Sequence, residues 1–206
     1  MKETYRFLLT ASILLATTFT LSCSSDDDES PDVSVINLSE LQNMRVTPPI
    51  ESGDLVLGGY ITVGKITNGK LSFDSLPNIK SNYSEYLTTF SEANRDWETG
   101  FDYPSGLSLF YVPYSTIYIS SGESCYIELY TVKPSGEKIE TYFVYFSQPG
   151  SITGTVTHNT GDVWTETWDA NFSEGWNFLY NVHGDNAVTH TSRHPGGDYE
   201  WQQYCN

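Results

Sequence analysis

The sequence predicts an all-β fold, either an antiparallel β-sandwich or a flattened up-and-down barrel of roughly nine or ten strands with one short helix. Aromatic residues make up 15% of the chain and charged residues only 17%, and aromatic side chains favour the half-buried surface of a sheet. From residue 107 onward, short alternating stretches are separated by short turns, which favours antiparallel neighbours. Both architectures bury one face of each strand, so the pattern fits either one.

The first half of the fold is predicted to contain a hairpin followed by the helix. Residues 55–63 form the first strand, in which Gly58-Gly59 indicates a bulge or a close approach of another backbone. Asn68-Gly69 predicts a tight hairpin into residues 70–73, because both residues tolerate positive φ. Residues 83–94 have helical periodicity, which predicts about three turns packed over an end or edge of the sheet. The apolar face of this helix would consist of Tyr83, Tyr86, Leu87 and Phe90.

The second half is predicted to be strands alone. Residues 139–146 are apolar on both faces, which predicts a strand in the centre of the fold. Pro134-Ser135-Gly136, Pro149-Gly150 and Gly184-Asp185-Asn186 mark turns. The other predicted strands cover residues 107–112, 116–119, 125–132, 151–157, 164–170, 176–182, 187–191 and 199–204.

The first thirty residues have the organisation of a secretory signal. Lys2 and Arg6 precede a mostly apolar stretch over residues 7–19, and small residues follow it. A transmembrane helix would need about 20 apolar residues, whereas this stretch is shorter and is interrupted by threonines. We therefore expect cleavage, either near residues 16–18 to release a soluble chain or immediately before Cys23.

Cleavage before Cys23 would make the protein a lipoprotein. Leu21-Ser22-Cys23 resembles the bacterial lipoprotein box, with Thr20 in place of the commonest leucine. The resemblance implies a lipid on the Cys23 thiol and an acyl chain such as palmitate on its amine. One acyl chain holds a membrane only marginally, at about 0.8 kcal/mol per buried CH₂, so stable anchoring takes more than one.

An acidic run follows this cysteine. Residues 25–29 resemble the surface-export signal of Bacteroidetes lipoproteins, which implies a place on the outer face of the outer membrane; a solvated charge run is the alternative. Residues 24–33 lack aromatic side chains and carry like charges, which predicts a flexible spacer. We expect a lipoprotein signal peptide over residues 1–22, a lipidated acidic tether and linker over residues 23–50, and a single β domain over residues 51–206.

Charge limits the classes of binding partner, and the number of cysteines bears on disulfide formation. The formal net charge of −16 would repel nucleic acid and anionic membrane surfaces, so neither is an expected partner. No motif in the sequence predicts a cofactor. With Cys23 lipidated, Cys125 and Cys205 remain, and an even number of cysteines in an exported protein favours a disulfide between them. One buried and one terminal free thiol are the alternative.

Several short segments together resemble a family of small β-rich surface lipoproteins of Bacteroidetes with no assigned activity. The segments span about residues 61–201 and are Asn68-Gly69-Lys70-Leu71-Ser72-Phe73 with Leu76-Pro77, Ile152-Thr153-Gly154-Thr155, Glu174-Gly175-Trp176-Asn177, and Trp201 after Pro195-Gly196-Gly197. The resemblance implies an exported β domain and supplies no catalytic residues.

The strongest candidate for a ligand site is one predicted strand. Trp164 and Trp168 share a strand face with Glu166 between them. A hairpin centred on Thr160 would place Gly154 opposite Glu166 and leave a gap, which is either a ligand notch or a packed edge. Tryptophan rings bind sugar faces by stacking, and the alternative is that these rings belong to the core.

The sequence predicts no metal site, although His183, His190 and His194 lie close to Asp185 and Asp198. In one strand, His190 and His194 would stand about 13 Å apart, too far to share an ion. A catalytic alternative uses carboxylates among tryptophans, as in glycosidases, where the spacing of two carboxylates decides the chemistry. The carboxylates concerned are Glu166, Asp169 and Glu174.

Together these observations predict a cell-surface lipoprotein that acts as a non-catalytic binding or adhesion module. Its expected partners are the outer membrane, through the lipid, and a glycan or a surface protein. The alternatives are an extracellular polysaccharide hydrolase that uses Glu166, and a purely structural envelope protein.

Overall fold

The computed structural model describes residues 36–59, 61–93, 100–111, 117–120, 124–159 and 162–205, and this part of the chain is all-β, as predicted. Its helical segments are α1 (Leu38–Leu41), α2 (Ile79–Asn82), the 3₁₀ turn η1 (Ser84–Tyr86) and α3 (Phe90–Ala93). The strands described are β1 (Val46–Thr47), β2 (Ser52–Leu57), β3 (Ile61–Thr67), β4 (Lys70–Phe73), β5 (Thr88–Thr89), β6 (Phe101–Asp102), β7 (Ser108–Tyr111), β8 (Ile117–Ser120), β9 (Ser124–Val132), β10 (Lys138–Phe146), β11 (Gly150–His158), β12 (Trp164–Phe172), β13 (Gly175–Gly184), β14 (Ala187–Thr191) and β15 (Asp198–Cys205). They outnumber the predicted nine or ten partly because β1, β5 and β6 have only two residues each.

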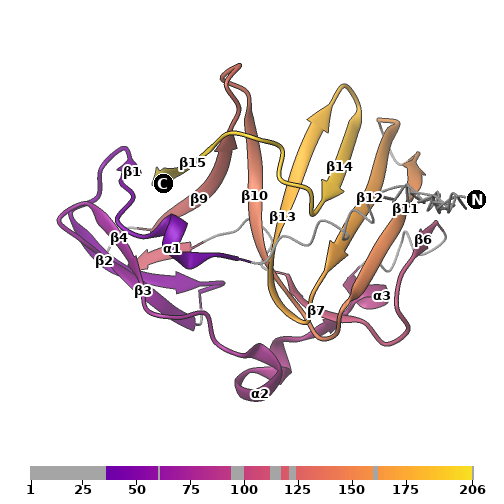
Figure 1. The fold of residues 1–206 in the computed structure, drawn as a ribbon, viewed down its shortest axis with the longest axis horizontal. Coiled ribbons are helices and arrows are strands. Elements are labelled where there is room, and N and C mark those ends of the chain that lie inside the picture. Colours follow the sequence, from indigo (N-terminus) through magenta and orange to yellow (C-terminus); the bar gives the residue numbers. More distant parts are fainter. Residues whose placement is uncertain are drawn as a thin grey trace, which may run out of the picture.

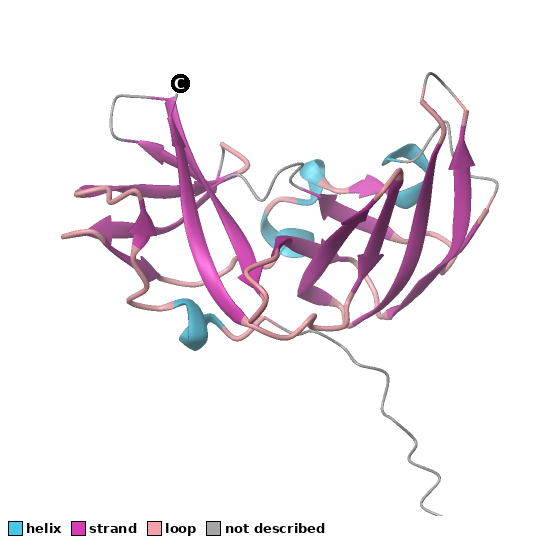
Figure 2. Ribbon diagram, turned by 90° about the horizontal axis from the view of Figure 1, so that it is seen from above, coloured by secondary structure: helices cyan, strands magenta, loops and turns pink. Residues whose placement is uncertain are grey.

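The strands form one large mixed sheet that folds into two groups (Figures 1 and 2). Its main path runs β4-β3-β2-β8-β9-β10-β13-β14-β12-β11-β6. β9 changes partner along its length, because residues 124–127 pair with β8 while residues 129–132 pair with β10. In Figure 1, β1 to β4 lie at one end and β6, β11 and β12 at the other, with β10 and β13 between them. The central strands β10 and β13 therefore connect the group that contains β1 to β4 with the group that contains β6, β11 and β12.

Two hydrophobic cores lie on opposite faces of these central strands. Side chains alternate between the faces of a strand, so Phe143 and Tyr145 of β10 enter the first core while Val144 and Phe146 enter the second. This confirms that residues 139–146 form a central strand buried on both faces. Fully buried members of the first core include Leu55, Leu71, Ile127 and Trp201, and the second core includes Phe90, Leu107, Ile152 and Phe172.

The first hairpin differs from its prediction. Gly58 and Gly59 are not a bulge within one strand but the turn between β2 and β3, with φ angles of 61° and 79°. Two adjacent residues with positive φ reverse the chain, and glycine adopts this conformation without steric cost. The hairpin at Asn68-Gly69 between β3 and β4 is confirmed, with φ angles of 52° and 74°.

The predicted helix over residues 83–94 is wrong. The segment divides into η1, the short strand β5 and the single turn α3, and Asn94 lies outside the described residues. Leu87 has extended backbone angles, and the two β-branched threonines of β5 favour the strand conformation that follows. Among the helices of the described ranges, none is long and apolar enough to cross a membrane.

β14 is inserted between β13 and β12. β13 and β14 form an antiparallel hairpin around the predicted turn at residues 184–186, and β14 then pairs with β12 in parallel. β1 and β15 also pair in parallel. The prediction of antiparallel neighbours is wrong for these two pairs. A short turn fixes only the direction of consecutive strands, and neither pair is consecutive.

The folded domain begins before residue 51, so the predicted boundary is too late. Leu41 and Val46 are buried in the first core. The Gln42 side chain accepts a hydrogen bond from the Phe73 amide and donates one to its carbonyl, at 3.0 Å and 2.9 Å. Residues 36–50 therefore belong to the β domain. The leader, Cys23 and the acidic run lie outside the described residues.

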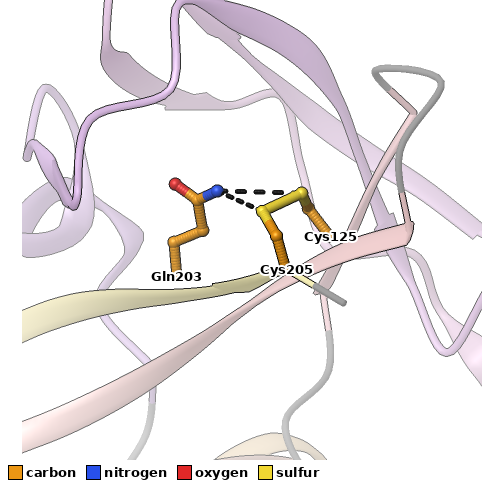
Figure 3. Close-up of a disulfide and its surroundings, with 3 residues drawn as sticks. All are labelled: Cys125, Gln203 and Cys205. Atoms are coloured by element: carbon orange, nitrogen blue, oxygen red, sulfur yellow. Dashed lines mark hydrogen bonds between the residues drawn. A yellow bond between two sulfur atoms is a disulfide. The ribbon is translucent and has the colours of Figure 1, made fainter.

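A disulfide joins Cys125 and Cys205, as Figure 3 shows. The two cysteines are register partners on the antiparallel strands β9 and β15, and 80 residues separate them in sequence. Gln203 donates hydrogen bonds to both sulfur atoms. The bridge holds the end of β15 against β9.

Candidate functional site

The three predicted ligand-site residues do lie on one face of β12, but the hairpin register differs from the prediction. His158 faces Trp164, and Gly154 faces Trp168 instead of Glu166. The expected notch at Gly154 is filled, because a Cβ built there would lie 2.0 Å from the carbonyl oxygen of Gly100. Gly154 is therefore part of a packed edge where β6 crosses close to β11.

The two tryptophans of β12 have different environments. Trp168 is only 8% exposed, stacks on His190 with ring centroids 4.3 Å apart, and meets Phe90 edge-on. It belongs to the second core. Trp164 is half-buried, stacks on the buried ring of His158 at 3.9 Å, and lines a pocket. Of the two rings, only Trp164 lines this larger pocket.

Glu166 is buried at the centre of a hydrogen-bond network. Its Oε2 atom lies 2.9 Å from Nε2 of His158. Its Oε1 atom accepts a hydrogen bond from the Trp168 indole at 2.7 Å and lies 3.2 Å from Nε2 of His190. Burial by itself raises the pKa of Glu166. The opposing effects are larger: the pKa is lowered by hydrogen bonds from His190, Trp168 and His158 and by the charge of His190, so the net shift is downward. The side chain is thus held as a carboxylate.

His190 connects this carboxylate to Asn181. Its Nδ1 atom lies 2.6 Å from Oδ1 of Asn181, while Nε2 faces Glu166. Both ring nitrogens therefore face side-chain oxygen atoms. His190 thus links the Glu166 carboxylate to the Asn181 amide.

A pocket of about 550 Å³ opens above this network. Trp164, Glu166 and His190 line it from β12 and β14, and Asn181 lines it from β13. At the opposite side, Glu140 accepts a hydrogen bond from the Tyr142 hydroxyl and lies 3.2 Å from Nε2 of the exposed His183. The pocket thus combines the aromatic rings of Trp164 and Tyr142 with carboxylate, amide and imidazole groups.

A second, smaller pocket of about 180 Å³ lies beside the first. Glu166 and His190 line both pockets. The other walls of the small pocket are apolar and include Phe90, Val144 and Trp168. Glu166 and His190 therefore lie between the two pockets.

The other predicted site residues do not join this cluster. Asp169 is exposed on the opposite face of β12, and Glu174 lies at the turn after β12, 2.9 Å from Nζ of Lys80. His194 packs edge-on against Tyr180 and Tyr199. Within the described ranges, no group of three or more histidine, cysteine or acidic side chains is arranged to hold a metal ion.

The sequence did not identify Glu140, Tyr142, His158 or Asn181 as members of the site, and it considered His190 only as a metal ligand. Glu140, Asn181, His190 and Trp168 are consecutive register partners across β10, β13, β14 and β12. This row depends on the insertion of β14 between β13 and β12. The alternation of apolar and polar residues within each strand does not predict this insertion.

Comparison of the chain with protein-family models, with curated proteins and with solved structures gives no match. The function is therefore argued from the geometry of this site.

Proposed function

We propose that the protein is a non-catalytic binding module and that the 550 Å³ pocket is its ligand site, with carbohydrate as the ligand. One observation carries the proposal. The half-buried Trp164 lines a pocket whose other walls present hydrogen-bonding groups held in place by their neighbours, notably Glu140 and Asn181.

This combination suits a sugar. An indole ring packs against the apolar face of a sugar ring, while carboxylate and amide oxygens accept hydrogen bonds from its hydroxyl groups. Ligand pockets in proteins typically combine apolar contact area with a few precisely placed polar groups. The two carboxylates of the pocket, Glu140 and Glu166, disfavour an anionic ligand.

Binding is favoured over hydrolysis because Glu166 is a poor proton donor. A glycosidase acid needs a raised pKa, whereas the pKa of Glu166 is lowered and both of its oxygens already accept hydrogen bonds. Glu140, the other carboxylate of the pocket, is three strands away on β10, about 14 Å between backbones at 4.8 Å per strand. Asp169 and Glu174 face elsewhere.

A glycan array, followed by calorimetry on the best binder, tests this proposal. Trp164→Ala and Glu140→Gln should weaken binding by about tenfold each. The matched control is Glu174→Gln, which removes the same charge at the turn after β12, away from the pocket. Failure of the wild type to bind any glycan, or equal losses in Glu140→Gln and Glu174→Gln, would overturn the assignment. Sugar release that Glu166→Gln abolishes would favour the hydrolase instead.

We also propose that Cys23 anchors this module on the outer face of the outer membrane. The support is the signal-like leader, the small residues before Cys23 and the acidic run after it. Residues 36–50 belong to the β domain, so the tether and linker predicted over residues 23–50 do not extend into them. Cys23→Ala should move the protein from the membrane fraction to the soluble fraction. Sedimentation of this variant with outer membranes would mean that the anchor lies elsewhere.

A further inference from the structure

The face of the sheet that holds the pocket continues well beyond it. Register partners form one unbroken row across six strands, and partners on neighbouring strands share a face of the sheet. The row consists of Glu200, Tyr130, Glu140, Asn181, His190 and Trp168, on β15, β9, β10, β13, β14 and β12. Five steps of about 4.8 Å give the row a length of about 24 Å.

The far end of this face is aromatic and polar, like the pocket. Tyr126 of β9 and Tyr204 of β15 are half-buried and stack with ring centroids 5.3 Å apart. The Tyr130 hydroxyl donates a hydrogen bond to Glu128 at 2.6 Å and lies 3.1 Å from the Tyr204 hydroxyl. A second cluster of rings with a fixed carboxylate therefore lies on the same face as Trp164.

The two ends are connected through residues that line both of them. A shallow depression of about 10 Å³ is lined by Glu128, Glu140 and Tyr142. Glu140 and Tyr142 also line the 550 Å³ pocket. A bound chain could therefore follow the face from one end to the other through these shared residues.

The carboxylates of this face keep hydrogen-bond acceptors for a ligand. The hydroxyls of Tyr130 and Tyr142 already donate to Glu128 and Glu140, and burial and the Glu128 carboxylate raise the pKa of Tyr130, so that hydroxyl keeps its proton. Each carboxylate oxygen can accept more than one hydrogen bond. A ligand with hydroxyl or amino groups can therefore donate to Glu128 and Glu140.

The charge of the face excludes acidic polymers. Glu128 and Glu140 lie along its middle, while Glu200 is compensated by Lys138 at 3.0 Å. Negative charges on a polymer would be repelled at Glu128 and Glu140.

From this continuity we infer that the site binds an extended polysaccharide chain without acidic groups, lying across the strands from Trp164 to the Tyr126–Tyr204 pair. The inference rests on the proposed function, because it extends the same site. It differs in requiring several sugar units to be bound at once.

The test compares polymers and then chain lengths. Electrophoresis through gels containing a neutral β-glucan, a neutral α-mannan, chitosan or alginate identifies the polymer that retards the protein, and alginate, which carries uronic acids, should not. Calorimetry then measures disaccharides to hexasaccharides of the retarding polymer. Affinity should rise by about tenfold or more toward the hexasaccharide as the distal rings are engaged.

Variants at the distal end separate this inference from the proposed function. Replacing Tyr126 and Tyr204 together by alanine should weaken hexasaccharide binding by about tenfold and leave disaccharide binding unchanged. Replacement of both by leucine keeps apolar bulk if the alanine variant unfolds, and should give the same result. Tyr86→Ala is the matched control, since Tyr86 is 38% exposed on η1, outside this row.

Each outcome is decisive. Equal affinity for disaccharide and hexasaccharide, or a distal variant that binds the hexasaccharide normally, overturns the extended site while the pocket proposal survives. Retardation by alginate as strong as by the neutral polymers overturns the charge argument. If no polymer retards the protein while the glycan array still shows binding at the pocket, the extended site is overturned and the pocket proposal stands.

Discussion

Replacing Glu166 by glutamine tests the buried network most directly. The side chain keeps its shape but loses its charge, and its amide group must then face a ring nitrogen of His158 or His190, at 2.9 Å and 3.2 Å from the carboxylate. Hydrogen bonds to charged groups contribute about 1.5–3 kcal/mol, and breaking a buried ion pair costs about 3–5 kcal/mol. Because glutamine keeps an acceptor for Trp168, we expect a loss of about 3 kcal/mol in the free energy of unfolding.

Urea unfolding at pH 7 measures this loss. Glu174→Gln is the control, because its carboxylate is exposed and pairs with Lys80 at the surface. Exposed pairs contribute about 0–1 kcal/mol, so the control should be close to wild type. If Glu166→Gln is no less stable than Glu174→Gln, the network does not stabilise the fold and the reasoning is refuted.

The pH dependence of the same pair gives an independent check. The pKa of Glu166 in the folded protein lies below its ordinary value of 4.5. The stability contributed by this carboxylate is therefore fully present above the unfolded-state pKa and is lost as the pH falls through the folded-state pKa. The stability difference between wild type and Glu166→Gln should narrow below about pH 4.5. A difference that widens on acidification would contradict the direction of the shift.

Two further predictions concern the stability of the fold around the site. Cys205→Ser removes the disulfide that closes a loop of 80 residues, and loop entropy predicts that the free energy of unfolding in urea falls by about 4–5 kcal/mol. Equal stability of the wild-type protein with and without a reducing agent would refute this prediction. Gly154→Ala places a methyl group against the Gly100 carbonyl at a φ of 137°, so it should cost more than about 3 kcal/mol. The control Gly136→Ala has a φ of 86° and no atom within 4 Å, so strain alone should cost about 1 kcal/mol, and thermal unfolding of both variants measures the difference.

The hairpin of β11 and β12 shows what alternation predicts and what it does not. Trp164, Glu166 and Trp168 share a face in any register, because side chains alternate with a period of two. The predicted register differed from the observed one by two residues, and a shift of two keeps every side chain on its face. Burial patterns in the sequence cannot distinguish these registers. In the observed structure Gly154, which lacks a Cβ, lies where β6 pairs closely with β11.

The helix prediction failed for a related reason. Tyr83, Tyr86, Leu87 and Phe90 do have helical spacing, but only Phe90 is fully buried, and it belongs to the second core. The other three residues lie at or near the first core. One straight helix cannot face two cores, so the segment bends at Leu87 and at β5. Tertiary packing overrode the local periodicity.

The pattern of residues along the sequence was enough to predict the all-β class, the Asn68-Gly69 turn and the central strand at residues 139–146. It also predicted that Trp164, Glu166 and Trp168 share one face of β12. Each depends on neighbours a few residues apart, where backbone geometry dictates the pattern. Only the tertiary structure decided that His158, His190 and Asn181 surround Glu166 and that Trp168 is core while Trp164 lines a pocket. Those contacts require β14 to enter between β13 and β12, and strand order is set by packing across the whole domain.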